Sequence, residues 1–82
     1  MKKRLRYVKL LIIEENQAKL REEIERQFQI YGKVEEIKFI PQGDKGQYKA
    51  SVLIVVEQNL AEFEKWTYLD GWEKELEYIL RQ

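Results

Sequence analysis

Residues 47–56 have the sequence QYKASVLIVV and predict the longest and most apolar strand of the chain. One face of this strand carries Tyr48, Ala50, Val52, Ile54 and Val56. The intervening residues on the other face are also partly apolar, so we expect this strand at the centre of a sheet.

The residues before this strand predict a helix and a hairpin. Residues 34–40 form a second expected strand, and the loop 41–46, with one Pro and two Gly, joins it to residues 47–56 as a hairpin. Residues 17–31 predict a helix, with Asn16 as its N-cap and Gly32 as the C′ glycine. The apolar stripe of this helix consists of Leu20, Ile24, Phe28 and Tyr31.

Residues 5–13 predict the first strand, and both of its alternating sets of side chains are largely apolar. Two strands joined through a helix are normally parallel, with a right-handed crossover. The strand 47–56 can then pair antiparallel between the other two. We therefore expect an α+β fold of ferredoxin-like type, β-α-β-β-α(-α), with a three-stranded sheet in the order 1-3-2 and the first strand at its edge.

The C-terminal residues 57–82 predict a helical extension of this single domain, which spans residues 1–82. Asn59 and Glu62 match a capping box that opens a helix over residues 60–69. A second apolar stripe, roughly 150° out of phase with the first at 100° per residue, predicts a separate helix over residues 72–80. The change of phase falls at Asp70-Gly71, where we expect the break.

The composition argues against most catalytic and metal-binding sites. The chain has no His and no Cys, one Ser and one Thr. A nucleophile with a histidine base, or a zinc site, cannot be assembled from one such chain. We therefore expect a non-enzymatic protein with no cofactor, no metal and no small-molecule substrate, although an enzyme that uses only carboxylates stays open.

The charges are balanced overall but separated along the chain. The chain contains fifteen Lys and Arg residues and fifteen Asp and Glu residues. Residues 1–13, however, include five of the basic residues and no acidic residue. Residues 57–80 carry seven acids against two lysines. This bipolar pattern suits head-to-tail self-association or an acidic segment that lies beside a basic strand.

The favoured function is a protein-interaction module that forms a homodimer or binds another protein. We expect the dimer to form by edge pairing of residues 5–13 or by exchange of residues 72–82 between subunits. Trp and Tyr dominate interface hot spots, which makes the aromatic residues near the C-terminus the leading candidates. The candidate partner-binding residues are Trp66, Tyr68, Trp72, Leu76, Tyr7 and Lys9.

Two other functions stay open. The first is nucleic-acid binding through phosphate contacts, for which the candidate residues are Lys2, Lys3, Arg4, Arg6 and Lys49. The second is inhibition of a host complex by a phage or mobile-element protein. No segment approaches the roughly 20 apolar residues of a membrane span, so we expect no membrane partner and a cytoplasmic setting.

The chain also shows a family resemblance over residues 5–56. It is carried by VKLLIIEEN at 8–16, by VEEIKF at 34–39, by YKASVLI at 48–54, and by Leu20, Ile24 and Phe28. This pattern of strand, acidic turn, amphipathic helix and hairpin resembles a small family of Gram-positive sporulation proteins. The resemblance implies a cytoplasmic bacterial protein without known enzymatic activity, and it transfers no functional residue.

Overall fold

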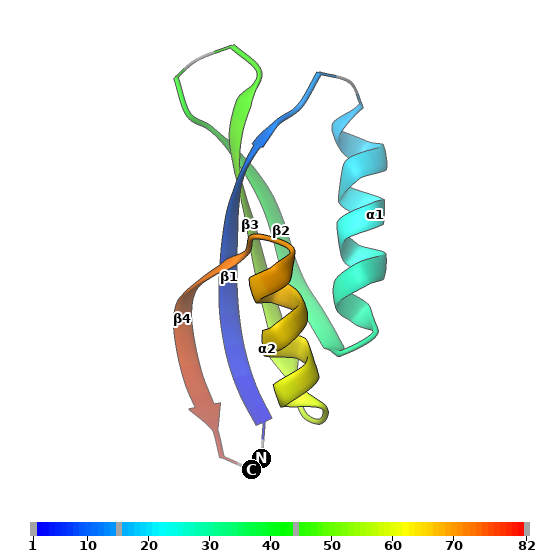
Figure 1. Ribbon diagram of the computed structural model, residues 1–82, viewed down its shortest axis with the longest axis vertical. Coiled ribbons are helices and arrows are strands. Elements are labelled where there is room, and N and C mark those ends of the chain that lie inside the picture. The colour runs from blue at the N-terminus through cyan, green and yellow to red at the C-terminus, as the bar shows by residue number, and fades with distance from the viewer. Residues whose placement is uncertain (1, 15, 44, 82) are drawn as a thin grey trace.

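The computed structural model describes residues 2–14, 16–43 and 45–81, which form an α+β fold (Figure 1). The expected helices over residues 17–31 and 60–69 and the two expected hairpin strands are present, with bounds close to those expected. The elements are β1 (Lys2–Ile12), α1 (Gln17–Gln29), β2 (Gly32–Pro41), β3 (Gln47–Val56), α2 (Leu60–Leu69) and β4 (Glu73–Leu80).

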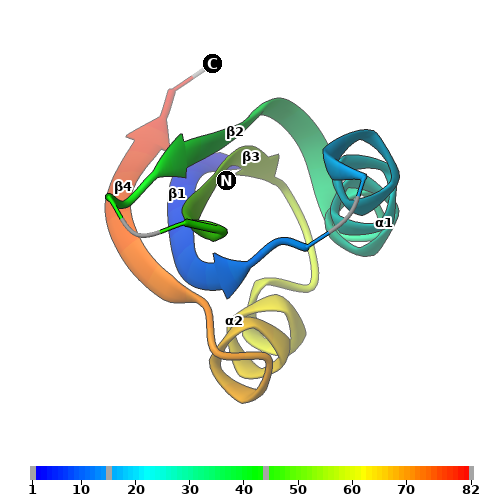
Figure 2. The ribbon, with the colours of Figure 1, turned by 90° about the horizontal axis from the view of Figure 1, so that it is seen from above.

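The sheet has four antiparallel strands in the order β2-β3-β1-β4. The predicted placement of β3 between β1 and β2 is confirmed, but the prediction of a three-stranded sheet is wrong. Seen along the long axis, both helices lie on one side of the sheet (Figure 2). No helix of the described residues covers the other side of the sheet, which we call the open face.

The predicted C-terminal helix over residues 72–80 is a strand, so residues 57–82 are not wholly helical. Leu76 and Leu80 fit a helical stripe, but Leu76, Tyr78 and Leu80 also alternate at the spacing of a strand. As β4, the segment pairs with Lys2–Val8 of β1. This pairing satisfies backbone groups that would otherwise line an unpaired sheet edge, and that gain outweighs local helix propensity.

The first strand is therefore not an edge strand over most of its length. From Lys3 to Val8 it lies between β3 on one side and β4 on the other. Edge pairing over the whole of residues 5–13 is excluded, because β4 already occupies that side as far as Val8.

The core lies between the helices and the sheet, and aromatic rings fill much of it. Phe28 and Phe63 are fully buried, with ring centroids 5.9 Å apart in a T-shaped arrangement. The other buried apolar residues are Leu5, Tyr7, Ile24, Ile37, Ala50, Val52, Ile54, Val56 and Trp72. A T-shaped pair adds about 0.5–1.5 kcal/mol beyond the area it buries.

The caps confirm one prediction and correct two. Asn16 caps α1 as expected, since its side chain accepts a hydrogen bond from the Ala18 N–H at 2.9 Å. Asn59 instead adopts a left-handed conformation, φ 58°, and its side chain makes no cap hydrogen bond. Gly32 begins β2, where a Cβ would lie 2.1 Å from the Val55 carbonyl oxygen. The predicted break at Asp70-Gly71 is present, with Gly71 at φ 84°.

Candidate protein-interaction site

One end of β1 extends beyond the strand that covers the rest of it. β4 pairs with β1 only from Lys2 to Val8, whereas β3 pairs with it as far as Ile12. Figure 1 shows β4 beside one half of β1, with the other half projecting together with the β2–β3 hairpin. Within residues 2–14, 16–43 and 45–81, no strand pairs with Lys9–Ile12 on the side opposite β3. We call residues 9–13 the free segment.

The backbone of the free segment offers hydrogen-bonding groups to a further strand. The Ile13 N–H donates to the Gly46 carbonyl at 2.8 Å, on the side of β3. Backbone groups alternate in direction along an antiparallel strand. The N–H and C=O groups of Leu10 and Ile12 therefore point away from β3, toward the uncovered side.

The side chains of the free segment on the open face are apolar and exposed. Buried Tyr7 faces the helices, so Leu10 and Ile12 face the opposite way. Leu10 is 73% exposed and Ile12 is 69% exposed. In the sheet register Leu10 and Ile40 lie on either side of Lys49, which adds a third exposed apolar residue to this patch.

A groove of about 550 Å³ lies over this part of β1. Val8, Lys9 and Leu10 of β1 line it, together with Gln42 and Lys49 on one side and Gly71, Glu73 and Glu75 on the other. The pairing of Val8 with Glu73 ends the β1–β4 ladder at one end of the groove. An added strand could therefore extend the sheet along β1 at the point where β4 begins.

The other two edges of the sheet are protected against such pairing. The outer strand β4 carries the charged residues Glu73, Lys74, Glu75 and Glu77. The outer strand β2 has an irregular register between Val34 and Glu36 and ends at a proline. Charges, bulges and prolines are the usual devices that blunt sheet edges, whereas residues 10–13 carry none of them.

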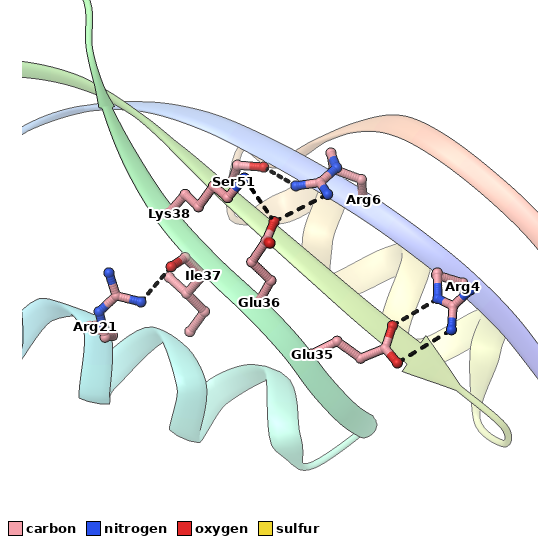
Figure 3. Close-up of polar contacts among 8 residues, drawn as sticks. All are labelled: Arg4, Arg6, Arg21, Glu35, Glu36, Ile37, Lys38 and Ser51. Atoms are coloured by element: carbon pink, nitrogen blue, oxygen red, sulfur yellow. Dashed lines mark hydrogen bonds and ion pairs between the residues drawn. The ribbon is translucent and has the colours of Figure 1, made fainter.

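Carboxylates of β2, which lies two strands away, hold two basic side chains of β1. Arg4 donates to both oxygens of Glu35, at 2.7 and 3.3 Å, and Arg6 donates to Glu36 at 3.3 Å (Figure 3). The hydrogen bonds from Arg4 lower the pKa of the Glu35 carboxyl below its usual value. Arg6 also donates to the buried hydroxyl of Ser51 at 2.6 Å.

Two further lysines of the nucleic-acid candidate set are paired in the same way. Lys3 lies 3.3 Å from a carboxylate oxygen of Glu77, and Lys49 lies 3.1 Å from one of Glu75. Phosphate binding at this strand would have to displace these carboxylates, which weakens the nucleic-acid hypothesis.

Two of the predicted partner-binding residues are parts of the core. Trp72 is 5% exposed, and its indole N–H donates to Asp70 at 2.9 Å. Tyr7 is 3% exposed and meets the Phe63 ring edge-on, so it does not lie on the open face. Burial raises the pKa of its phenol.

The other predicted residues are scattered over separate surfaces. Half-buried Trp66 stacks on Tyr31 with ring centroids 5.7 Å apart. Tyr68 on α2 is 80% exposed, whereas Leu76 lies opposite Arg6 on the open face. Lys9 lies 3.4 Å from Asp70 and 5.5 Å from the centre of the Trp72 ring. The structure does not bring this set together as one surface.

Sequence reasoning proposed edge pairing of residues 5–13 but did not name Leu10, Ile12 or Ile40 as candidate site residues. The available signal was the apolar run from residue 10 to residue 13, which we interpreted as evidence that both faces of the strand are covered. The structure leaves one side chain of each successive pair exposed there, because Leu10 and Ile12 point to the open face, away from both helices.

Among the described residues, no cluster of three or more Asp or Glu side chains could hold a metal ion. Neither helix in those ranges has the length and hydropathy needed to cross a membrane. Comparison of the chain with protein-family models, with curated proteins and with solved structures finds no match. The resemblance to Gram-positive sporulation proteins stays a prediction.

Proposed function

We propose that this protein is a non-enzymatic protein-interaction module that binds its partner by adding a strand to the free segment of β1. The observation that carries the proposal is the contrast between the edges. Residues 10–13 are uncharged and unpaired on one side, with Leu10 and Ile12 exposed, while the edges at β2 and β4 are protected. Strand addition uses backbone hydrogen bonds for affinity and alternate side chains for specificity.

The energy available at this edge is modest. Full burial of Leu10 and Ile12 would contribute about 1.5–3 kcal/mol each, and each added backbone hydrogen bond about 0.5–1.5 kcal/mol net. Association costs about 4–15 kcal/mol or more, because the two partners lose translational and rotational freedom. The balance favours reversible binding that depends on a few side-chain anchors.

We also infer that the fold is ferredoxin-like. The element order β-α-β-β-α-β and the position of β3 between β1 and β2 support this assignment. The ferredoxin-like fold is common and occurs in proteins with many unrelated functions, so the fold assignment does not itself identify a partner. The argument for binding depends on the edge of β1.

The proposal is tested by selecting ligands from a random peptide library displayed on phage. We expect the selected peptides to alternate apolar and polar residues and to shift the backbone NMR signals of residues 9–13. Their binding should be lost in the Ile12→Pro variant, which removes an outward N–H without removing a bond to β3. The matched control, Leu69→Pro at the exposed end of α2, should bind as the natural chain does, provided that its NMR spectrum shows a folded domain.

Two results would contradict the proposal. One is a set of selected peptides whose NMR shifts map to another surface of the protein. The other is peptide binding that Ile12→Pro leaves unchanged in a variant whose spectrum shows the native fold.

A further inference from the structure

We propose that the strand added at the free segment is the same segment of a second copy of this chain, antiparallel to the first and with Leu11 on the two-fold axis. The inference rests on the proposed strand addition and names its partner. Three observations support it: the length of the free segment, the directions of its backbone groups, and the placement of its charges.

The length of the free segment matches the pairing. With Leu11 opposite the partner's Leu11, Lys9 lies opposite the partner's Ile13. Pairing beyond this point is blocked in both directions, because Val8 is already paired with Glu73. The chain also leaves the sheet after residue 13, where it turns toward α1. The unpaired edge of one chain is therefore as long as the free segment of a second chain.

The backbone groups fit the same register. Leu10 lies opposite the partner's Ile12, and both present their N–H and C=O groups outward. Such a pair exchanges both of its N–H···O bonds, and the two-fold axis repeats the exchange on the other side of Leu11. Leu11 and the partner's Leu11 then form a non-hydrogen-bonded pair, with Cα atoms about 4.5 Å apart.

The side chains of this register are compatible. Leu10 and Ile12 of both copies meet on the open face, where each is more than two-thirds exposed in the single chain. The free segment begins with Lys9 and is followed by Glu14. Antiparallel pairing places each Lys9 at the same end as the partner's Glu14, so the charges at each end of the paired segments are opposite in sign, while Lys9 keeps its ion pair with Asp70.

A cysteine cross-link tests the register directly, because the natural chain contains no Cys. The expected separation of about 4.5 Å at Leu11 lies within the 4.4–6.8 Å that a disulfide needs. We expect Leu11→Cys to form a covalent dimer under mild oxidation. The control Leu69→Cys, at a site that is 72% exposed on α2, should form no comparable amount. Leu11 packs against the core, so a folded spectrum of the reduced variant is required.

The molar mass in solution provides the second readout. Light scattering after size exclusion should give roughly twice the 10.0 kDa of the chain at high concentration, and one chain mass for the folded variants Ile12→Pro and Leu10→Lys. Leu10→Lys leaves the backbone hydrogen-bonding groups unchanged but places a charge among the Leu10 and Ile12 side chains of the two copies.

The outcomes separate this inference from the proposed function. A strict monomer overturns the second-copy inference, whereas strand addition would still stand if the selected peptides bind at residues 9–13. A dimer that survives Ile12→Pro, or that fails to cross-link through Leu11→Cys, also overturns the inference and indicates another interface. Exchange of β4 between subunits would give that result.

Discussion

Replacement of Gly32 by alanine should destabilise the domain strongly, for a reason that the sequence did not indicate. A Cβ at this position would lie 2.1 Å from the Val55 carbonyl oxygen and 2.9 Å from the Val55 carbonyl carbon. Both atoms are backbone atoms, so a side-chain rotation cannot relieve the clash. The first residues of β2 would have to move away from β3 to restore ordinary contact distances.

The magnitude follows from the cost of overpacking. Such insertions cost typically about 1–3 kcal/mol, and we expect the upper end because backbone must move. A domain of 82 residues has a total stability of roughly 4–12 kcal/mol at 0.05–0.15 kcal/mol per residue. A loss of about 3 kcal/mol corresponds to a fall of about 12–24 °C in Tm for a domain of this size.

Two further variants make the assay specific. Gly32→Asn should be at least as destabilising as Gly32→Ala, because Asn tolerates a left-handed backbone but not a backbone clash. Gly43→Ala is the control: Gly43 has φ 92° but nothing within 4 Å of a new Cβ, so we expect a smaller loss of about 1–2 kcal/mol. Thermal and urea unfolding measure all three. A loss below 1 kcal/mol for Gly32→Ala would refute the reasoning.

Three further predictions concern β1. Leu11→Pro should lower the free energy of unfolding in urea by about 1–3 kcal/mol more than Ile12→Pro does, because only Leu11→Pro leaves a carbonyl of β3 without its N–H donor. Equal losses would contradict the alternating directions of the backbone N–H groups in residues 11 and 12. Since burial raises the pKa of Tyr7 above its ordinary 10.0, its contribution to stability is complete below pH 10 and declines as pH rises through the folded-state pKa. Tyr7→Phe should therefore reduce the alkaline loss of stability, and an unchanged pH profile would count against this. Arg4→Ala should raise the pKa of Glu35 toward its ordinary value, which a carboxyl NMR titration would detect; no change would show that Arg4 does not hold this carboxylate in solution.

Much of the fold could be predicted because the pattern was local. The helix 60–69, the N-cap at Asn16 and the strand 47–56 depend on residues close together in the sequence, and the structure confirms each of them. The position of β3 between β1 and β2 followed from general rules on crossovers and hairpins.

The segment 73–80 could not be assigned because its pattern fits two structures. Leu76 and Leu80 are spaced for a helix, and Leu76, Tyr78 and Leu80 are spaced for a strand. The choice depends on the unpaired edge of β1, almost the whole chain away, where Lys2 pairs with Leu80. The pattern of a short stretch of sequence does not show which distant segment it will pair with.

The candidate site was missed for a related reason. A sequence shows that Leu10 and Ile12 are apolar, but their exposure depends on which face of the sheet the helices cover, and their backbone pairing depends on how far β4 extends along β1. Conversely, Trp72 and Tyr7 looked like interface residues, but large aromatic side chains are also what a small core needs. Residue type alone does not separate these two uses.

Amide hydrogen exchange at residues 10–13, followed by NMR in dilute and in concentrated protein, tests the central claim most directly. The account predicts that the amides of Leu11 and Ile13 are protected at every concentration, since they face β3. The amides of Leu10 and Ile12 should exchange fast in dilute protein and become protected as the second copy adds its strand. Equal protection of all four amides in dilute protein would show that the edge is already covered. Fast exchange of Leu10 and Ile12 in concentrated protein, and with selected peptides bound, would contradict strand addition.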